Sequence, residues 1–338
     1  MIELSVIICT HNPRPDYLDR VLAALRRQTL PTDHWELLLI DNASEPALAG
    51  KWDLSWHPHA RHIREDELGL TAARLCGIME ARSELLVFVD DDNLLSSNYL
   101  EKALDIAKCY AFLGAWGGII RGEFEIEPEP WLRSLLGSLA IREFSAPIWS
   151  NNPTDWSAHP CGAGLCVRMK VAETYSGQLA VNPARRRLDR IGSALSSCGD
   201  SDLVQTSCDV GQGFGNFPQL VMTHLIPESR VQPDYLIRLM QGITVSAIVL
   251  NRVRFGDLPA KPDRLRVWAR YVEMRVRRGR HAARIYSASQ KAVRAGIKEA
   301  LAIGADLEEG QPPGGRIQRC NSTNEPEIST HHALPDSR

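Results

Sequence analysis

Three consecutive aspartates, Asp90, Asp91 and Asp92, follow directly on the apolar run at residues 85–89. A strand that runs straight into carboxylates places hard oxygen ligands at one point on a rigid edge. Mg²⁺ and Mn²⁺ prefer such ligands and keep positions open for phosphate oxygens, so the triplet predicts a divalent cation that bridges a diphosphate. Because side chains alternate along a strand, Asp90 and Asp92 are expected to hold the ion and Asp91 to face the other way. The alternative is a solvated turn in which Asp92 and Asn93 cap the following helix.

The elements that position this triplet are predicted by apolar runs and helical spacings. Residues 4–10 and 36–41 have the pattern of buried strands that end in polar turns. A helix after the first strand carries apolar residues at helical spacing from Tyr17 to Leu25, with Asp16 as its cap. The other expected elements are a short strand near 62–63, a helix at 71–82, strands at 85–89, 116–120 and 165–167, a helix at 202–210, and helices from 234 onward.

The alternation of strands and helices predicts the α/β class, with a mostly parallel sheet covered by helices on both faces. In such sheets the ligand site lies beyond the carboxyl ends of the strands. Asn12, Asp41 and the aspartate triplet each follow a strand directly. We therefore expect all of them at the same edge of the sheet.

Composition and charge narrow the class of protein. The chain has 338 residues, 44% of them hydrophobic, and a formal net charge of -2, so it can bury a large core and has no overall preference for nucleic acid. Its eight cysteines include no CxxC pair, which predicts reduced thiols in the cytoplasm. The start of the chain lacks a signal-peptide pattern. The longest late apolar run, residues 243–250, is far shorter than the roughly 20 residues of a spanning helix, so none is expected.

Four segments carry polar residues or glycine at strand ends and helix entries. They read VIICTHN at 6–12, LIDNAS at 39–44, ELGLTAAR at 67–74 and VFVDDD at 87–92. In this order they resemble the motifs of the family 2 glycosyltransferases, inverting enzymes of the GT-A fold that use nucleotide sugars, and the resemblance covers about residues 5–235. Each segment alone has an ordinary alternative, since Asp41 with Asn42 makes a turn and Arg74 suits an exposed helix position. Agreement of four in the family's order is much harder to obtain by chance.

The resemblance implies roles for individual residues. Donor binding is implied for Thr10, Asn12, Asp41, Gly69, Arg74, Asp90 and Asp91, with Asp41 accepting hydrogen bonds from the nucleotide base. Binding of the cofactor, Mn²⁺ or Mg²⁺, is implied for Asp92, Asp90 and His224. Acceptor binding is implied for Gly162, Ala163, Gly164, Trp156 and Asp202, where the glycines alternatively serve a tight turn and the tryptophans at 131, 149 and 156 alternatively pack in the core.

The family's catalytic base usually sits in a Glu-Asp pair shortly before a helix, and the matching residues here are Gly199 and Asp200. Asp200 is therefore the implied base, able to take the proton of an attacking hydroxyl. Because its acidic neighbour is missing, a shift of this role to Asp202 stays open, as does the alternative that these residues only cap a helix. His224 has a structural alternative, and Arg230 is interpreted either as a neutraliser of the diphosphate or as an exposed arginine.

The implied function is transfer of a sugar from a nucleotide-diphosphate donor to a hydroxyl of a glycan or lipid-linked acceptor, in cell-surface polysaccharide or glycolipid synthesis. A single displacement inverts the anomeric centre. Two alternatives stay open. One is a catalytically inert sugar-nucleotide or glycan binding module, suggested by Gly199. The other is a sugar-phosphate nucleotidyltransferase, which is disfavoured because residues 11–15 lack a glycine-rich, lysine-bearing phosphate loop.

The predicted domains are a catalytic domain at 1–230, a basic helical extension at 231–304 and a disordered tail at 305–338. The catalytic domain divides into a nucleotide-sugar half at about 1–122 and an acceptor half at about 123–230. Eight arginines between 264 and 284 alternate with apolar residues. This pattern predicts either peripheral contact with anionic lipid at the inner face of the membrane or a packed helix with a solvated basic face. Nucleic acid is not an expected partner because no recognition motif accompanies the charge.

Overall fold

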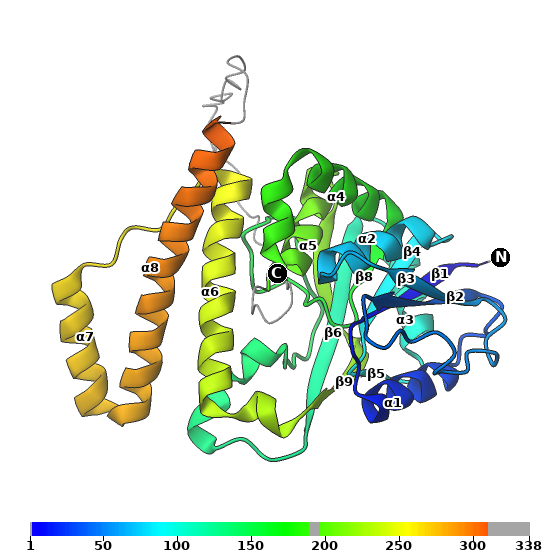
Figure 1. Ribbon diagram of the computed structural model, residues 1–338, viewed down its shortest axis with the longest axis horizontal. Helices are drawn as coiled ribbons and strands as arrows, with labels where there is room; N and C mark the ends of the chain where they lie inside the picture. The colour runs from blue at the N-terminus through cyan, green and yellow to red at the C-terminus, as the bar shows by residue number, and fades with distance from the viewer. Residues whose placement is uncertain (1, 190–196, 310–338) are drawn as a thin grey trace, which may run out of the picture.

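The computed structural model describes residues 2–189 and 197–309, which form a sheet covered by helices and followed by a helical extension (Figure 1). The strands are β1 (Leu4–Thr10), β2 (Trp35–Asn42), β3 (Ala60–Glu65), β4 (Leu85–Asp90), β5 (Asn93–Leu95), β6 (Leu113–Phe124), β7 (Ile148–Ser150), β8 (Cys166–Arg168) and β9 (Gly213–Ile226). The helices are α1 (Pro15–Arg26), α2 (Leu70–Glu80), α3 (Tyr99–Cys109), α4 (Met169–Val181), α5 (Gly199–Asp209), α6 (Pro233–Phe255), α7 (Arg264–Arg277) and α8 (Gly279–Glu309), with short 3₁₀ turns η1 (Pro130–Leu139), η2 (Pro183–Leu188) and η3 (Glu228–Val231).

The described strands form one sheet in the order β3-β2-β1-β4-β8-β6-β9-β5, with β7 paired to β9. The first four of these are mutually parallel, so their carboxyl ends share one edge. There Thr10 lies beside Asp41, and Cys9 lies beside Asp90. The expected meeting of strand-end residues at one edge therefore follows from the strand register.

Two hydrophobic cores cover the two faces of the sheet. Along β1, Val6 and Ile8 point into a core shared with α1 and α3, while Ile7 points into a core shared with α2, α4 and α5. Both faces are buried, which is why the parallel strands appear in the sequence as nearly continuous apolar runs. The predicted α/β class, with helices on both faces of a mostly parallel sheet, is confirmed.

Some element boundaries differ from the predictions. Helix α1 has Arg14 as its N-cap and Pro15 at its first position, so Asp16 lies inside the first turn and is not the cap. Helix α5 begins at Gly199, three residues before the expected start at 202, which places Asp200 on the helix. Helix α8 runs to Glu309, past the expected start of the tail at 305, and residues 310–338 of that tail lie outside the described residues.

Helix α6 corrects the expectation that no segment is long enough to span a membrane. By length and composition alone it qualifies, with 23 residues that include an 18-residue stretch of mean hydropathy 1.3. The core helix of a globular protein passes the same test, and Leu236, Leu239 and Leu250 of α6 are buried in the present structure. The helix packs between η1 and α8.

Candidate active site

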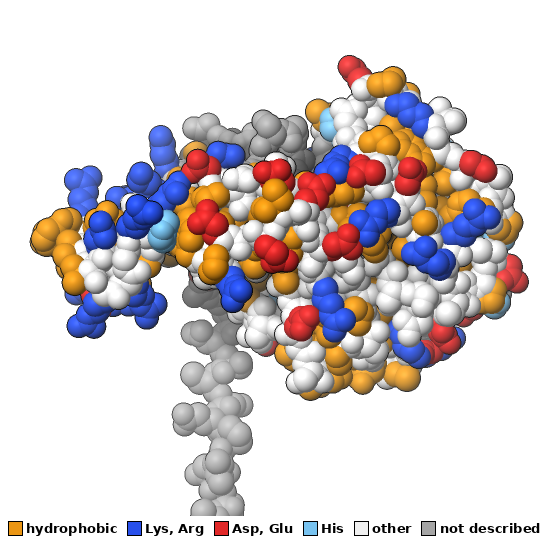
Figure 2. Space-filling model, turned by 90° about the horizontal axis from the view of Figure 1, so that it is seen from below, with side chains coloured by type: hydrophobic (Ala, Val, Ile, Leu, Met, Phe, Trp, Pro, Cys, Tyr) orange, Lys and Arg blue, Asp and Glu red, His pale blue; other side chains and the backbone are white. Residues whose placement is uncertain are grey.

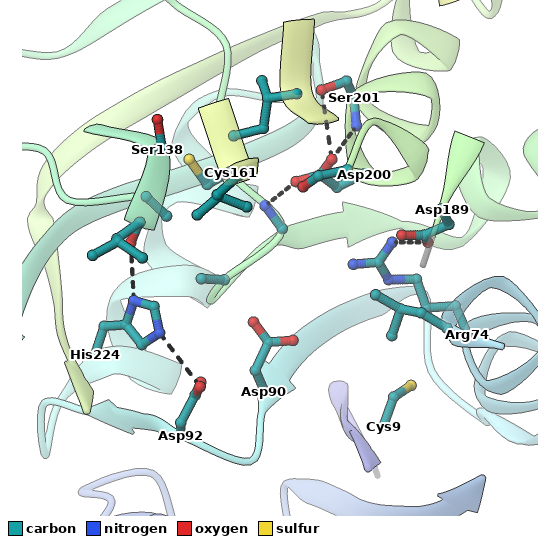
Figure 3. Close-up of a pocket in the computed structure, with 18 of the residues that line it drawn as sticks. Cys9, Arg74, Asp90, Asp92, Ser138, Cys161, Asp189, Asp200, Ser201 and His224 are labelled. Carbon is teal, nitrogen blue, oxygen red and sulfur yellow. Dashed lines mark hydrogen bonds and ion pairs between the residues drawn. The ribbon is translucent and has the colours of Figure 1, made fainter. Parts of the chain in front are cut away.

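A cavity of about 490 Å³ opens at the carboxyl ends of β1 and β4 (Figure 3). The predicted site residues that line it are Thr10, Gly69, Arg74, Asp90, Asp91, Asp92, Trp156, Gly162, Ala163, Asp200 and His224. Segments far apart in the sequence thus meet around one volume. The size is in the range of small-molecule sites.

The three aspartates all reach this cavity. Strand β4 ends at Asp90, and Asp91 and Asp92 form a turn, so strand alternation does not continue and Asp91 does not face the other way as expected. The Thr10 hydroxyl donates a hydrogen bond to Asp91. Burial, and next the neighbouring Asp92 carboxylate, raise the pKa of Asp91 to about 7. Burial together with the nearby carboxylate therefore favours the protonated form of Asp91 more than in water.

Asp92 is neutralised by two cationic side chains. Its Oδ2 atom lies 2.8 Å from Nη1 of Arg230 and 3.4 Å from Nε2 of His224. Burial favours a raised pKa for Asp92, but His224 and Arg230 outweigh it and lower the pKa to about 2. Asp92 is 6% exposed and the next element is strand β5, so the alternative of a solvated turn capping a helix is wrong.

His224 comes from β9, which pairs with β5 in a register that sets His224 opposite Asn93. Its Nδ1 atom donates to the Leu139 carbonyl at 2.9 Å, which leaves Nε2 toward Asp92. Burial alone lowers the pKa of this imidazole, but the Asp92 carboxylate outweighs burial and raises it. The histidine therefore tends toward its protonated form as long as Asp92 is its neighbour.

The side chains of this cluster have the donor atoms that suit a divalent cation, but they are not arranged as a complete metal site. Within residues 2–189 and 197–309, no three His, Cys, Asp or Glu side chains are placed to hold a metal ion. Three carboxylates nevertheless share one cavity, where burial first and the Asp92 carboxylate second raise the pKa of Asp91. Hard oxygen donors of this kind are what Mg²⁺ and Mn²⁺ prefer.

Asp200 lies across the cavity from the triplet, in the first turn of α5 (Figure 3). Its Oδ2 atom accepts a hydrogen bond from the Gly162 backbone N–H at 2.8 Å, and its Oδ1 atom accepts one from the Ser201 N–H at 2.7 Å. The first bond ties the carboxylate to the glycine-rich segment before β8, and the second ties it to the first turn of α5. The Asp200 side chain is therefore held in a fixed orientation.

Asp202 is not brought to the cavity, which corrects its predicted role as acceptor residue or alternative base. Its side chain is fully buried and accepts two hydrogen bonds from Arg185, both at 2.7 Å, and one from Arg254 at 2.7 Å. Two residues along a helix turn the side chain by about 200°, so Asp200 and Asp202 face opposite ways. Asp202 ties α5 to η2 and α6.

Two residues expected to bind the donor, Asp41 and Asn12, do not line the cavity. Asp41 does not line the cavity, because its carboxylate accepts hydrogen bonds from the N–H groups of Ser44 and Leu48 and pairs with Arg64 at 2.8 Å. Asn12 braces the same loop by accepting from the Glu45 N–H and is absent from the cavity lining. The residue after Asp41, for which the sequence predicts only a turn, does line the cavity.

That residue is Asn42, whose Oδ1 atom accepts from the Gly69 N–H at 2.9 Å and whose Nδ2 atom donates to the Glu67 carbonyl at 2.7 Å. Gly69 has a φ of 149°, which few residues other than glycine adopt. Asn42 thereby fixes the loop that starts α2 and its wall of the cavity.

Comparison with known proteins identifies the segment that builds this edge. Residues 5–167 match the family model described as glycosyl transferase family 2. The segment belongs to that family. Over 101 residues it is 30% identical to the uncharacterized glycosyltransferase YwdF of Bacillus subtilis (strain 168), covering 30% of this chain and 37% of that protein. Over 104 residues it is 28% identical to glycosyltransferase AglE of Haloferax volcanii, covering 30% and 34%. The alignments thus span about a third of each curated relative.

Solved structures extend the likeness along the chain. The mannosyltransferase PcManGT from Pyrobaculum calidifontis, solved with GDP-Man and Mn²⁺, has a TM-score of 0.51 and 18% identity, covering 92% of this chain and 76% of that one. S. aureus TarS 1–349 has a TM-score of 0.47 and 14% identity, covering 93% of each chain. The predicted GT-A fold is confirmed. The family match ends inside β8, so Asp200 and His224 lie beyond it.

A buried ion pair links the family 2 segment to the region after it. Arg74 on α2 pairs with Asp189 at 2.7 Å, and Thr71 donates to the same carboxylate at 3.3 Å. The Arg74 side chain is only 7% exposed, so the alternative of an exposed helix position is wrong. A Cβ atom added at Gly199 would lie 2.5 Å from Oδ2 of Asp189. Asp189 therefore occupies the space beside Gly199, next to Asp200.

Some of the residues predicted to bind the acceptor line the cavity, and others pack elsewhere. Gly162, Ala163 and Trp156 line the cavity, whereas Gly164 does not. Gly164 has a φ of 68°, and its carbonyl accepts from the Tyr99 hydroxyl at 2.6 Å, so it serves the tight turn. Of the three tryptophans, Trp131 stacks on His281 and Trp149 meets Phe112 edge to face, and both lie outside the cavity lining.

Helix α6 supplies a wall that the predicted domain boundaries exclude. Tyr235, Leu239 and Ile243 line the cavity although they follow residue 230, the expected end of the catalytic domain. Arg142 and His159 also line it, and Nη1 of Arg142 donates to the His159 carbonyl at 2.6 Å. These residues carry no motif in the sequence. They are brought in by packing of segments that are distant in sequence.

Proposed function

We propose that this chain transfers a sugar from a nucleotide-diphosphate donor to a hydroxyl acceptor in one inverting displacement. The observation that carries the proposal is the shared cavity, with Asp90, Asp91 and Asp92 at the end of β4 on one side and Asp200 on the other. A carboxylate cluster suits the charged donor phosphates together with a divalent cation. A single fixed carboxylate facing it suits a base.

On the donor side, Asp90 and Asp92 would hold Mn²⁺ or Mg²⁺, with His224 beside Asp92. When bound, the ion supplies positive charge that stabilises the leaving diphosphate. Arg230 adds a second cation near the same carboxylate, 2.8 Å from Asp92. Thr10 holds Asp91 by its hydroxyl. The complex of PcManGT with GDP-Man and Mn²⁺ supports a nucleotide sugar and a metal for a protein of this fold.

On the acceptor side, Asp200 takes the proton of the acceptor hydroxyl while the hydroxyl oxygen forms its bond to the anomeric carbon. The bond between that carbon and the phosphate oxygen breaks, and the nucleoside diphosphate leaves with the electron pair. The Gly162 and Ser201 N–H groups keep the carboxylate oriented through this step. Trp156 offers an aromatic face for a sugar ring of the acceptor.

The alternative of an inert binding module rests on Gly199, where the family's acidic neighbour of the base is missing. The position of Asp189 argues against this alternative, because its carboxylate fills the space that a side chain at 199 would take. We propose that Asp189, oriented by Arg74, supplies the acidic group from another part of the chain. The chain then has both acidic groups that catalysis is expected to use. A cytoplasmic enzyme acting on a glycan or lipid-linked acceptor of the cell surface is the setting we propose.

A screen for donor hydrolysis tests the proposal. Purified protein is incubated with UDP-, GDP- and dTDP-sugars in Mn²⁺, in Mg²⁺ or with EDTA, and release of nucleoside diphosphate and binding are measured. We expect metal-dependent binding that Asp90→Asn removes, and turnover that Asp200→Asn lowers by about 100-fold or more while binding persists. Asp33→Asn, an exposed change outside the cavity, is the matched control.

Absence of binding for every donor would contradict the donor site. Tight binding with no turnover, even with glycan and lipid-linked acceptors added, would favour the inert module. Equal activity of Asp200→Asn and the control would exclude Asp200 as the base.

A further inference from the structure

Helix α7 presents an apolar stripe to solvent. Leu265, Trp268, Val272 and Val276 follow one another at intervals of three or four residues, which places them on one face of the helix. Their exposed fractions are 79%, 66%, 38% and 78%. None of the residues of α7 is buried. We call these four residues the α7 apolar stripe.

The stripe is separate from the face by which α7 packs. Val267 and Met274 are partly covered and lie on the side opposite the stripe, and α7 packs against α8. Figure 1 shows α7 held away from the sheet by α6 and α8. An ordinary packed helix needs one apolar face, whereas α7 has a second that the described chain leaves uncovered.

Arginines flank the stripe on both sides. At about 100° per residue, Arg264 and Arg275 fall along one border and Arg266 and Arg277 along the other. Glu273 is the single acidic residue of α7, and it pairs with Arg270 and Arg277. Figure 2 shows Lys and Arg gathered on this lobe with apolar side chains at its outer edge. The surface is apolar along its centre and positive along its edges.

We infer that α7 is a membrane-docking helix that lies in the interface of a bilayer containing anionic lipid. Exposed Trp, Leu and Val side chains enter the boundary between headgroups and acyl chains, and the flanking arginines meet lipid phosphates. Charge favours this occupant over a second copy of the chain, since pairing two stripes would bring arginine borders together. Binding to nucleic acid would also leave the stripe unexplained, because arginines alone contact phosphates and apolar side chains do not.

The inference is independent of the proposed catalysis, because vesicle binding is measured without donor or acceptor. The full chain is floated with vesicles of phosphatidylcholine alone and with vesicles that also contain phosphatidylglycerol, at low and high salt. We expect recovery with the anionic vesicles only, and lower recovery at high salt.

The test variant is Leu265→Ser with Val276→Ser, and the matched control is Met79→Ser with Val181→Ser, which are 76% and 83% exposed elsewhere on the surface. All four positions are exposed, so folding is expected to be retained and is checked by circular dichroism. We expect the α7 variant to lose at least about ten-fold in vesicle partitioning and the control to match the original chain.

Three results would overturn the inference. One is absence of the intact chain from anionic vesicles, and another is equal partitioning of the α7 variant and the control. The third is a concentration-dependent dimer, seen by sedimentation velocity, that dissociates in the α7 variant without any vesicle binding, which would assign the stripe to a second copy of the chain.

Discussion

Asp200 and Asp202 stand two residues apart and provide a sharp test of the site. We predict that Asp202→Asn destabilises the protein without removing the base, and that Asp200→Asn removes the base with little loss of stability. Asp202 is fully buried against Arg185 and Arg254, whose side chains are only 9% and 6% exposed. Removing its charge takes a counterion from both buried guanidinium groups, of which Arg254 keeps its pair with Asp209.

The expected size of the effect follows from these contacts. Removing one partner of a buried ion pair costs about 3–5 kcal/mol, and asparagine keeps one acceptor oxygen, so we expect about 3 kcal/mol. For a chain of 338 residues that is a fall of about 5 °C in melting temperature. Asp200→Asn weakens hydrogen bonds from two backbone N–H groups, which we expect to cost about 1 kcal/mol and to lower the melting temperature by about 2 °C.

The assay compares thermal unfolding, followed by circular dichroism, with donor hydrolysis at a temperature where both variants are folded. We expect Asp202→Asn to keep at least about a tenth of the turnover and Asp200→Asn to keep about a hundredth or less. A melting temperature unchanged by Asp202→Asn, together with loss of its turnover, would refute the reasoning. It would mean that Asp202 reaches the reacting atoms in solution.

Three further predictions concern other parts of the chain. Gly118→Ala places a Cβ 2.1 Å from a backbone oxygen of β9, so we expect a loss of about 3 kcal/mol or more by urea unfolding, whereas Gly137→Ala, with open space around it, changes little. Burial, and then a neighbouring histidine, lower the pKa of His57 from 6.5 to about 4, so the unfolded chain binds a proton that the folded chain does not. The stability it contributes is present above pH 6.5 and is lost as the pH falls toward 4, by about 2 kcal/mol between pH 7 and 5, and His57→Phe should reduce this loss. Asp189→Ala removes the carboxylate that pairs with buried Arg74 and leaves it the charges of Asp200 and Asp90, so we expect a cost of about 3 kcal/mol and lower turnover. Unchanged melting and turnover would show that the pair has neither role.

The parallel half of the sheet was predictable because its chemistry is local. Strands β1, β2 and β4 are buried on both faces, so each appears as an apolar run, and the polar residues after them must lie at the common edge. The antiparallel half could not be predicted in this way. Strand β9 contains glycines, a proline and residues of alternating burial, so it does not appear as an apolar run. Its pairing with β6 and β5 depends on distant partners.

The carboxylates of the site could be predicted from the sequence, but most of the residues that contact them could not. Asp200 and Asp202 look alike in sequence, and only the start of α5 at Gly199 decides which of them faces the cavity. No sequence pattern marks Asp189 as a site residue. Its importance comes from its ion pair with Arg74 and from its position beside Gly199. Contacts between segments more than 100 residues apart leave no local pattern.

Helix α6 has a consequence for any attempt to isolate a smaller working fragment. A fragment ending at residue 230 would contain every carboxylate of the cavity, yet it would lack Tyr235, Leu239 and Ile243 from one wall. It would also expose the apolar residues of η1 that α6 covers. The helical extension is therefore not a removable appendage, and truncations should be placed after α8, where the helix ends at Glu309.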